Sequence, residues 1–145
     1  TVPPARTTAT TALPAMTARG WGRVVNVASI AGKTGAPYIA AYAASKHGLL
    51  GLTKVAALEC AARGVTVNAV CPGYVDTPMT DESIRRIVEK TGVSAADVRK
   101  RLEDSSPQKR LYTAAEVSAL VAFLCGDAAA GINGQALSVD GGTFL

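Results

Sequence analysis

Residues 23–71 read RVVNVASIAGKTGAPYIAAYAASKHGLLGLTKVAALECAARGVTVNAVC, and this stretch decides the fold. At its two ends, residues 23–28 and 65–71 are short runs rich in β-branched side chains, which predict two strands buried on both faces. Between them, residues 39–63 are rich in Ala, Leu and Lys, contain no proline and stop at Gly64, so they predict a long helix. This order is typical of parallel strands joined by a right-handed crossover.

The rest of the chain continues the alternation of helices and strands. Residues 81–110 hold fourteen of the 26 charged residues, and apolar side chains recur there at helical spacing, which predicts two short amphipathic helices on the surface. Thr113 and Glu116 form a capping box that begins a further helix, which runs to Leu124. Residues 135–140 predict a last strand. The order predicts an α/β fold with an open, doubly wound parallel sheet.

Composition places the chain among cytoplasmic globular proteins. The 145 residues are 48% hydrophobic and 18% charged, with a mean hydropathy of +0.21, which is too apolar for a disordered chain. No run of about eighteen apolar residues occurs, so no membrane partner is expected, and no secretory leader is expected either. The three cysteines are scattered and lack CxxC spacing, which indicates small buried residues in a reducing compartment.

Charge and histidine content exclude two further classes of function. The net charge of +4 comes from residues of alternating sign that do not cluster, so a solvated surface is favoured over a nucleic-acid site. His47 is the only histidine, which leaves little support for a metal site or a histidine-based triad. Neither a metal nor a nucleic-acid partner is therefore expected.

Two glycine patterns resemble phosphate-binding loops without meeting their requirements. Gly32-Lys-Thr looks like the end of a P-loop, but that motif needs a glycine five residues earlier, where Val27 stands. Gly20-x-Gly22 lacks the third glycine of a dinucleotide fingerprint, and it precedes a predicted strand where the fingerprint must follow one. No glycine-rich turn for a pyrophosphate is found in this sequence.

Ser29, Tyr42 and Lys46 form the set of residues that suggests chemistry. Ser29 ends a predicted strand, where a parallel sheet presents residues to its ligand crevice. Tyr42 and Lys46 are four residues apart and so share one face of the predicted helix. An ammonium beside a phenol favours the phenolate and lowers a phenol pKa from its usual value of about 10, which suits proton transfer near neutral pH. A serine hydroxyl can polarise a carbonyl oxygen, so the set suits ketone reduction with a hydride from a cofactor.

Several motifs occur in the order and spacing of a known family. They are Asn26-Val-Ala-Ser29, Tyr42-Ala-Ala-Ser-Lys46-His-Gly48, Val67-Asn68-Ala-Val-Cys-Pro72-Gly73-Tyr-Val75-Asp-Thr77-Pro-Met79 and Val139-Asp140-Gly-Gly142. With them the chain resembles the C-terminal half of a short-chain dehydrogenase/reductase (SDR) from residue 13 onward. The resemblance implies a Rossmann-like fold whose N-terminal dinucleotide-binding βαβ units are missing, so 13–145 would be the catalytic half and 1–12 an irregular Thr/Pro-rich arm.

The resemblance also implies roles for individual residues. Tyr42 would be the general acid/base, Ser29 would bind the substrate carbonyl, and Lys46 would hold the nicotinamide ribose. Further contacts to NAD or NADP would come from Tyr42 and from Pro72, Gly73, Val75 and Thr77, the last two near the carboxamide. Residues 81–110 fall where the family keeps a mobile substrate lid. Asn68 is expected to fix the backbone and not to touch a ligand.

The implied function is NAD(P)-dependent reduction of a ketone of the 3-oxoacyl or polyketide type, or oxidation of the corresponding alcohol. A 3-hydroxybutyrate-type dehydrogenase is an alternative, although Ala31 and Ile39 occupy loop positions where polar residues for a carboxylate are expected. A second alternative is a truncated, inactive fragment that acts only in self-association through an apolar strand edge. Expected partners are a small carbonyl or alcohol substrate and copies of the same chain, as a dimer or tetramer.

Overall fold

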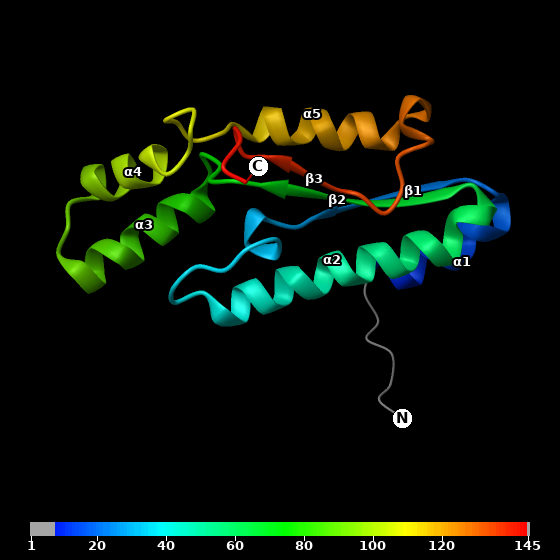
Figure 1. Ribbon diagram of the computed structural model, residues 1–145, viewed down its shortest axis with the longest axis horizontal. Helices are drawn as coiled ribbons and strands as arrows, with labels where there is room; N and C mark the ends of the chain where they lie inside the picture. The colour runs from blue at the N-terminus through cyan, green and yellow to red at the C-terminus, as the bar shows by residue number, and fades with distance from the viewer. Residues whose placement is uncertain (1–7, 145) are drawn as a thin grey trace.

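The computed structural model describes residues 8–144, which form a three-stranded parallel sheet with helices on both faces (Figure 1). The strands are β1 (Gly22–Val27), β2 (Val65–Pro72) and β3 (Ala136–Val139), in the spatial order β1-β2-β3. In the register Gly22 lies opposite Val65, and Ala69 lies opposite Ala136. The predicted α/β class with a parallel sheet is confirmed.

Within residues 8–144 five α-helices accompany the sheet, and two of them lie beyond its carboxyl end. The helices are α1 (Thr8–Arg19), α2 (Ala40–Cys60), α3 (Pro78–Thr91), α4 (Ala95–Asp104) and α5 (Ala114–Cys125). Short 3-10 turns occupy Ile30–Gly32, Ala61–Arg63 and Asp127–Ala129. In Figure 1 α1 and α2 lie on one face of the sheet and α5 on the other, which is the doubly wound arrangement.

Alternate side chains of β2 supply the cores on the two faces of the sheet. Val67 packs with Ala56 and Ala57 of α2, whereas Val70 packs with Leu124 of α5. All eight residues of β2 are buried, as expected for a strand between two neighbours and two helical layers. Small side chains such as Ala56 and Ala57 allow this long helix to lie close to the sheet.

β1 differs from the prediction that it is buried on both faces. Four of its six residues are half-buried, and Val27 is 53% exposed. The reason is its position, because β1 pairs only with β2 and no strand among residues 8–144 pairs with its other edge. Periodicity identified the strand, but it carries no information about which neighbours the strand has.

Residues 8–12 correct the predicted arm, because they form the first turns of α1. The prediction relied on the five threonines and two adjacent prolines of residues 1–12, but residues 8–12 belong to a helix that packs on β1. Tertiary contact outweighs low helix propensity here. The remainder of the predicted arm, residues 1–7, lies outside the described residues.

The charged segment forms a helical hairpin beyond the carboxyl ends of the strands (Figure 1). α3 and α4 pack against each other. Each contributes one buried apolar side chain, Ile84 from α3 and Val98 from α4. The two predicted amphipathic helices are therefore confirmed. The ends of the hairpin meet again at one backbone bridge between Val75 and Tyr112, and we call this bridge the neck of the hairpin.

Two expectations about single residue types have mixed outcomes. Cys60 and Cys71 are buried free thiols, but Cys125 is exposed, so the expectation of buried cysteines fails there. Asn68 is fully buried, where it donates to the Ile132 carbonyl at 2.7 Å and accepts from the Gln135 N–H at 3.0 Å. Asn68 thus fixes backbone groups, but they lie 64 and 67 residues away in the sequence and not in the local backbone that was expected. Within residues 8–144 no helix is long and apolar enough to span a bilayer.

Candidate active site at the carboxyl edge of the sheet

Tyr42 and Lys46 lie on one face of α2, next to the carboxyl end of β1. The Lys46 ammonium donates to the Val27 carbonyl over 3.1 Å and lies 5.6 Å from the centre of the Tyr42 ring. The Tyr42 side chain is partly open, at 43% exposure, and its phenol has no hydrogen-bond partner among the described residues. The structure therefore brings the predicted pair together and leaves the phenol accessible.

Ser29 lies at the end of β1 but has a local partner. Its hydroxyl accepts from the Ala31 N–H at 3.1 Å and caps the 3-10 turn that follows. That turn packs against α2, so Ser29 lies on the same edge as Lys46. No hydrogen bond within residues 8–144 joins the Ser29 hydroxyl to the Tyr42 phenol. As a hydroxyl, Ser29 still has its own proton to donate while it accepts from Ala31.

Cys71 connects the ends of β1 and β2 beneath this edge. Burial raises the pKa of the Cys71 thiol, against the lowering effects of the Lys33 charge, a backbone hydrogen bond from Ser29 and the Lys46 charge. Lys33 in turn donates to the Ser138 hydroxyl of β3 at 2.8 Å. The loop after β1 is therefore tied to β3 at this edge, and Cys71 is a buried thiol with a raised pKa.

The residues that follow β2 extend the same edge. Pro72 ends the strand and is buried, and the Gly73 N–H donates to the Val139 carbonyl of β3 at 3.0 Å. Val75 and Thr77 are half-buried. The Val75 carbonyl accepts from the hydroxyls of Thr77 and Thr80, at 3.3 Å and 2.6 Å. No hydrogen bond or ion pair among residues 8–144 joins this segment directly to the Tyr42 or Lys46 side chain.

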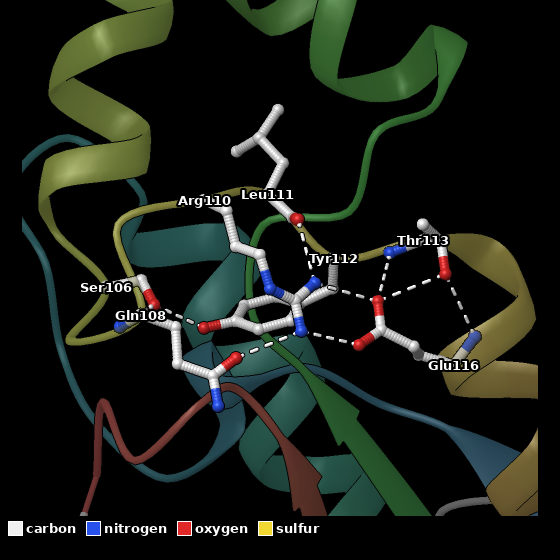
Figure 2. A network of polar contacts seen from close by, with 7 residues as sticks. All are labelled: Ser106, Gln108, Arg110, Leu111, Tyr112, Thr113 and Glu116. Carbon is white, nitrogen blue, oxygen red and sulfur yellow. Dashed lines mark hydrogen bonds and ion pairs between the residues drawn. The ribbon is translucent and has the colours of Figure 1, made fainter.

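A network of polar contacts around Arg110 and Tyr112 adjoins residues 72–77 (Figure 2). The sequence motifs did not predict this network. The Arg110 guanidinium donates to both carboxylate oxygens of Glu116, at 2.6 Å and 2.9 Å, and lies 4.9 Å from the centre of the Tyr112 ring. The Arg110 hydrogen bond, followed by the Thr113 backbone N–H, lowers the pKa of Glu116 to about 2. The Tyr112 hydroxyl bonds to the Ser106 hydroxyl.

The sequence held only part of the signal for this network. The capping box of Thr113 and Glu116 is present as predicted, with both reciprocal bonds formed. Its Glu116 carboxylate also receives Arg110, six residues earlier. Side-chain neighbours on a helix are three or four residues apart. Arg110 is six residues from Glu116 and lies before the helix begins, so helical spacing does not predict this pair. Only the turn of the chain through Leu111 and Tyr112 makes the contact, so spacing rules could not identify it.

Two open hollows lie away from the catalytic candidates. One of about 460 Å³ lies between α3 and α4, with Ile84, Val88 and Ala95 among its lining residues. The other, of about 430 Å³, lies at the amino end of the sheet beside Trp21 and Thr66. Within residues 8–144 no group of three metal-ligating side chains occurs.

Sequence comparisons connect this chain to oxidoreductases. The family profile described as "Enoyl-(Acyl carrier protein) reductase" matches residues 5–143. A D-beta-hydroxybutyrate dehydrogenase of Rhizobium meliloti (strain 1021) is 43% identical over 132 residues, which are 90% of this chain and 51% of that protein. An acetoacetyl-CoA reductase of Shinella zoogloeoides is 42% identical over 127 residues, 88% of this chain and 48% of that protein.

Solved structures give the same result. An actinorhodin polyketide ketoreductase variant, crystallised with NADPH, superposes with a TM-score of 0.84 at 44% identity over 88% of this chain and 49% of that one. Sorbitol-6-phosphate 2-dehydrogenase of Erwinia amylovora gives a TM-score of 0.89 at 30% identity, over 94% of this chain and 54% of that one. The chain spans about half the length of the curated relatives it matches. With its fold, its edge residues and its profile in agreement, the chain belongs to the short-chain dehydrogenase/reductase family.

Proposed function

We propose that this chain is the catalytic half of an NAD(P)-dependent oxidoreductase that reduces a ketone or oxidises the corresponding alcohol. One observation carries the proposal: Lys46 is fixed to the Val27 carbonyl beneath the accessible Tyr42 ring, at the carboxyl edge of a parallel sheet. This edge is where open α/β sheets bind their ligands. A cation under a phenol at that place is suited to proton transfer to a carbonyl oxygen.

The proposed mechanism assigns one task to each of three side chains. Ser29 donates a hydrogen bond from its hydroxyl to the substrate carbonyl oxygen and orients that oxygen, and it keeps its proton. Tyr42 transfers its phenolic proton to that oxygen as the carbonyl carbon receives a hydride, so ketone, hydride and proton together give the alcohol. Lys46 stabilises the phenolate that remains until a solvent proton restores the phenol. In the oxidative direction Tyr42 accepts the hydroxyl proton.

The residues at this edge suit the nicotinamide end of a dinucleotide. A lysine ammonium has three donors, and one of those of Lys46 is used on Val27, so two are available for ribose hydroxyls. Val75 and Thr77 are the candidates for contact with the carboxamide. When bound, NAD or NADP supplies the hydride. The sequence holds no glycine-rich turn, so we assign none of its residues to the pyrophosphate.

We propose a 3-oxoacyl or polyketide-type substrate. Acetoacetyl-CoA reductase and a polyketide ketoreductase are among the similar proteins. A hydroxybutyrate-type substrate is the second candidate, favoured by the identity with the Rhizobium protein. Ala31 and Ile39 are both apolar, and Ala31 is buried, so neither offers a partner for a free carboxylate. This favours a substrate whose acyl group is carried as a thioester.

We also propose self-association, as a dimer or tetramer. α2 presents Val55 and Leu58 to solvent, and they are 53% and 81% exposed. These positions are three residues apart and share one face of the helix, on the side away from the buried Ala56 and Ala57. A second copy of this chain would cover such a face, whereas the fragment alternative would have self-association as its only activity.

A labelled turnover assay tests the proposed reaction. The full protein is incubated with acetoacetyl-CoA or free acetoacetate. The NADH or NADPH in the assay carries deuterium at both positions of the nicotinamide carbon that donates the hydride. The alcohol product is expected to gain one deuterium per turnover, and the thioester is expected to react faster than the free acid. Faster reaction of the acid would support the hydroxybutyrate alternative. No label in any product would favour the inactive fragment and contradict the proposal.

A further inference from the structure

We infer that Arg110 and Glu116 are positioning residues that clamp the neck of the helical hairpin and thereby place Val75 and Thr77. The inference rests on the proposed function, in which these two residues face the nicotinamide. It concerns side chains that lie outside the motif set, in a part of the molecule where Figure 2 shows the contacts converging.

The backbone around Tyr112 is held from both sides. Before it, Arg110 donates to the Leu111 carbonyl at 3.2 Å. After it, the Glu116 carboxylate accepts from the Thr113 backbone N–H at 2.8 Å and from the Thr113 hydroxyl at 3.0 Å. Because Arg110 and Glu116 are bonded to each other through two parallel contacts, they form a clamp across residues 111–113. A bidentate arginine–carboxylate pair fixes direction as well as distance.

The clamped residue is the one that reaches the nicotinamide-facing segment. The Tyr112 N–H donates to the Tyr74 carbonyl at 2.9 Å, and the Asp76 N–H donates to the Tyr112 carbonyl at 2.8 Å. These bonds flank Val75, whose own N–H takes no part in the bridge. A shift of the Tyr112 backbone would therefore displace Val75. Because the Thr77 hydroxyl donates to the Val75 carbonyl, the start of α3 would move as well.

The Tyr112 ring adds a second constraint at the same place. It is only 2% exposed, and a methyl group on Gly73 would lie 3.0 Å from its edge, while one on Gly141 would strike its hydroxyl. The ring therefore fits a slot between the end of β2 and the turn after β3. Arg110 covers its other side at 4.9 Å from the ring centre, in the range of a cation–π contact.

The neck also sets the base of the hairpin. α3 begins directly after Thr77, and α4 ends at Asp104, two residues before Ser106, which bonds to the Tyr112 hydroxyl. Arg99 of α4 pairs with Asp76 at 2.9 Å. Both ends of the excursion are thus attached to the residues that the clamp fixes. The alignment of the hairpin over the carboxyl edge depends on this base.

The test compares Arg110→Lys and Arg110→Ala with Arg86→Lys in the full protein. Lysine keeps the charge but cannot form the two parallel bonds, so it should not rescue the clamp. Arg86 is a matched control, because it forms an exposed pair with Glu82 on α3 and does not contact Tyr112. Hydrogen exchange at the Asp76 amide reports on the neck without any need for activity.

Exchange at Asp76 is expected to rise about fivefold in both Arg110 variants, while the Val67 amide inside β2 and the Arg86→Lys control stay unchanged. A merely global loss of stability would accelerate exchange at Asp76 and Val67 alike, and this would overturn the inference. Unchanged exchange at Asp76 would overturn it as well.

Cofactor binding separates failure of the clamp from failure of the proposed function. NADH and NADPH are titrated by nicotinamide fluorescence, and turnover is measured with acetoacetyl-CoA. For Arg110→Lys the dissociation constant and the cofactor KM should rise about fivefold, with kcat within about twofold. A fall in kcat alone, with unchanged cofactor affinity, would overturn the inference. No cofactor binding by the unaltered protein would overturn the proposed function, and with it the functional meaning of the clamp.

Discussion

At the residue scale, Tyr42 and Lys46 of α2 depend for their placement on a contact with β1. Their separation of four residues placed them on one helix face, and the structure confirms that they lie together. The Val27 carbonyl that receives the Lys46 ammonium belongs to a strand nineteen residues earlier. No local pattern specifies such a contact. It follows only from the crossover that lays α2 along the sheet.

Glu116 makes the ion-pair network sensitive to acid. Its pKa falls from 4.5 to about 2, chiefly through Arg110, so the ionised carboxylate contributes stability that is complete above pH 4.5. This contribution is lost as the pH falls from 4.5 towards 2. Glu116→Gln keeps the capping geometry but removes the charge. Urea unfolding should therefore show a stability deficit of the variant at pH 6 that is much smaller at pH 2.5. A deficit of equal size at both pH values would contradict the assignment.

At the element scale, the turn chemistry of the chain was readable before the structure. The stop at Gly64 after a proline-free helix was predicted, and Gly64 adopts φ +69, between the last turn after α2 and the start of β2. The capping box at Thr113 was also predicted and is formed. Residue periodicity did not show that β1 has a single neighbour, so the side chains of β1 were expected to be as buried as those of β2. Only the resemblance to half of a larger sheet implied an exposed apolar strand edge.

Two glycine substitutions test how these elements are joined. Gly64→Ala places a methyl group in the left-handed region and against the Gly20 carbonyl, so it should destabilise the protein by about 1–3 kcal/mol. Gly51→Ala lies inside α2, where an added methyl group meets nothing, so it should stabilise by up to about 1 kcal/mol. Denaturant unfolding at pH 7 measures both changes. A stable Gly64→Ala variant would show that the junction between α2 and β2 tolerates another backbone path.

At the scale of the whole molecule, the candidate functional residues lie at one end of the sheet. Tyr42, Lys46, Ser29 and the neck of the hairpin all gather at the carboxyl ends of the strands. The family motifs predicted most of this gathering, because each motif ends a strand or begins a helix at that edge. They did not predict the clamp. The clamp forms because the chain, after the 28 residues 78–105, comes back to pair Tyr112 with Val75.

The most direct test of the account is the turnover of Tyr42→Phe beside Tyr38→Phe in the full protein, assayed with acetoacetyl-CoA and the preferred nicotinamide cofactor. Both variants lose one hydroxyl from the same chain segment, but Tyr38 is fully exposed and has no assigned role. Removal of the general acid should lower kcat by about 10²–10⁴-fold for Tyr42→Phe, with an unchanged unfolding midpoint, whereas Tyr38→Phe should keep the rate of the unaltered protein. If Tyr42→Phe retained most of the turnover, Tyr42 would not be the acid, and the central claim would be wrong.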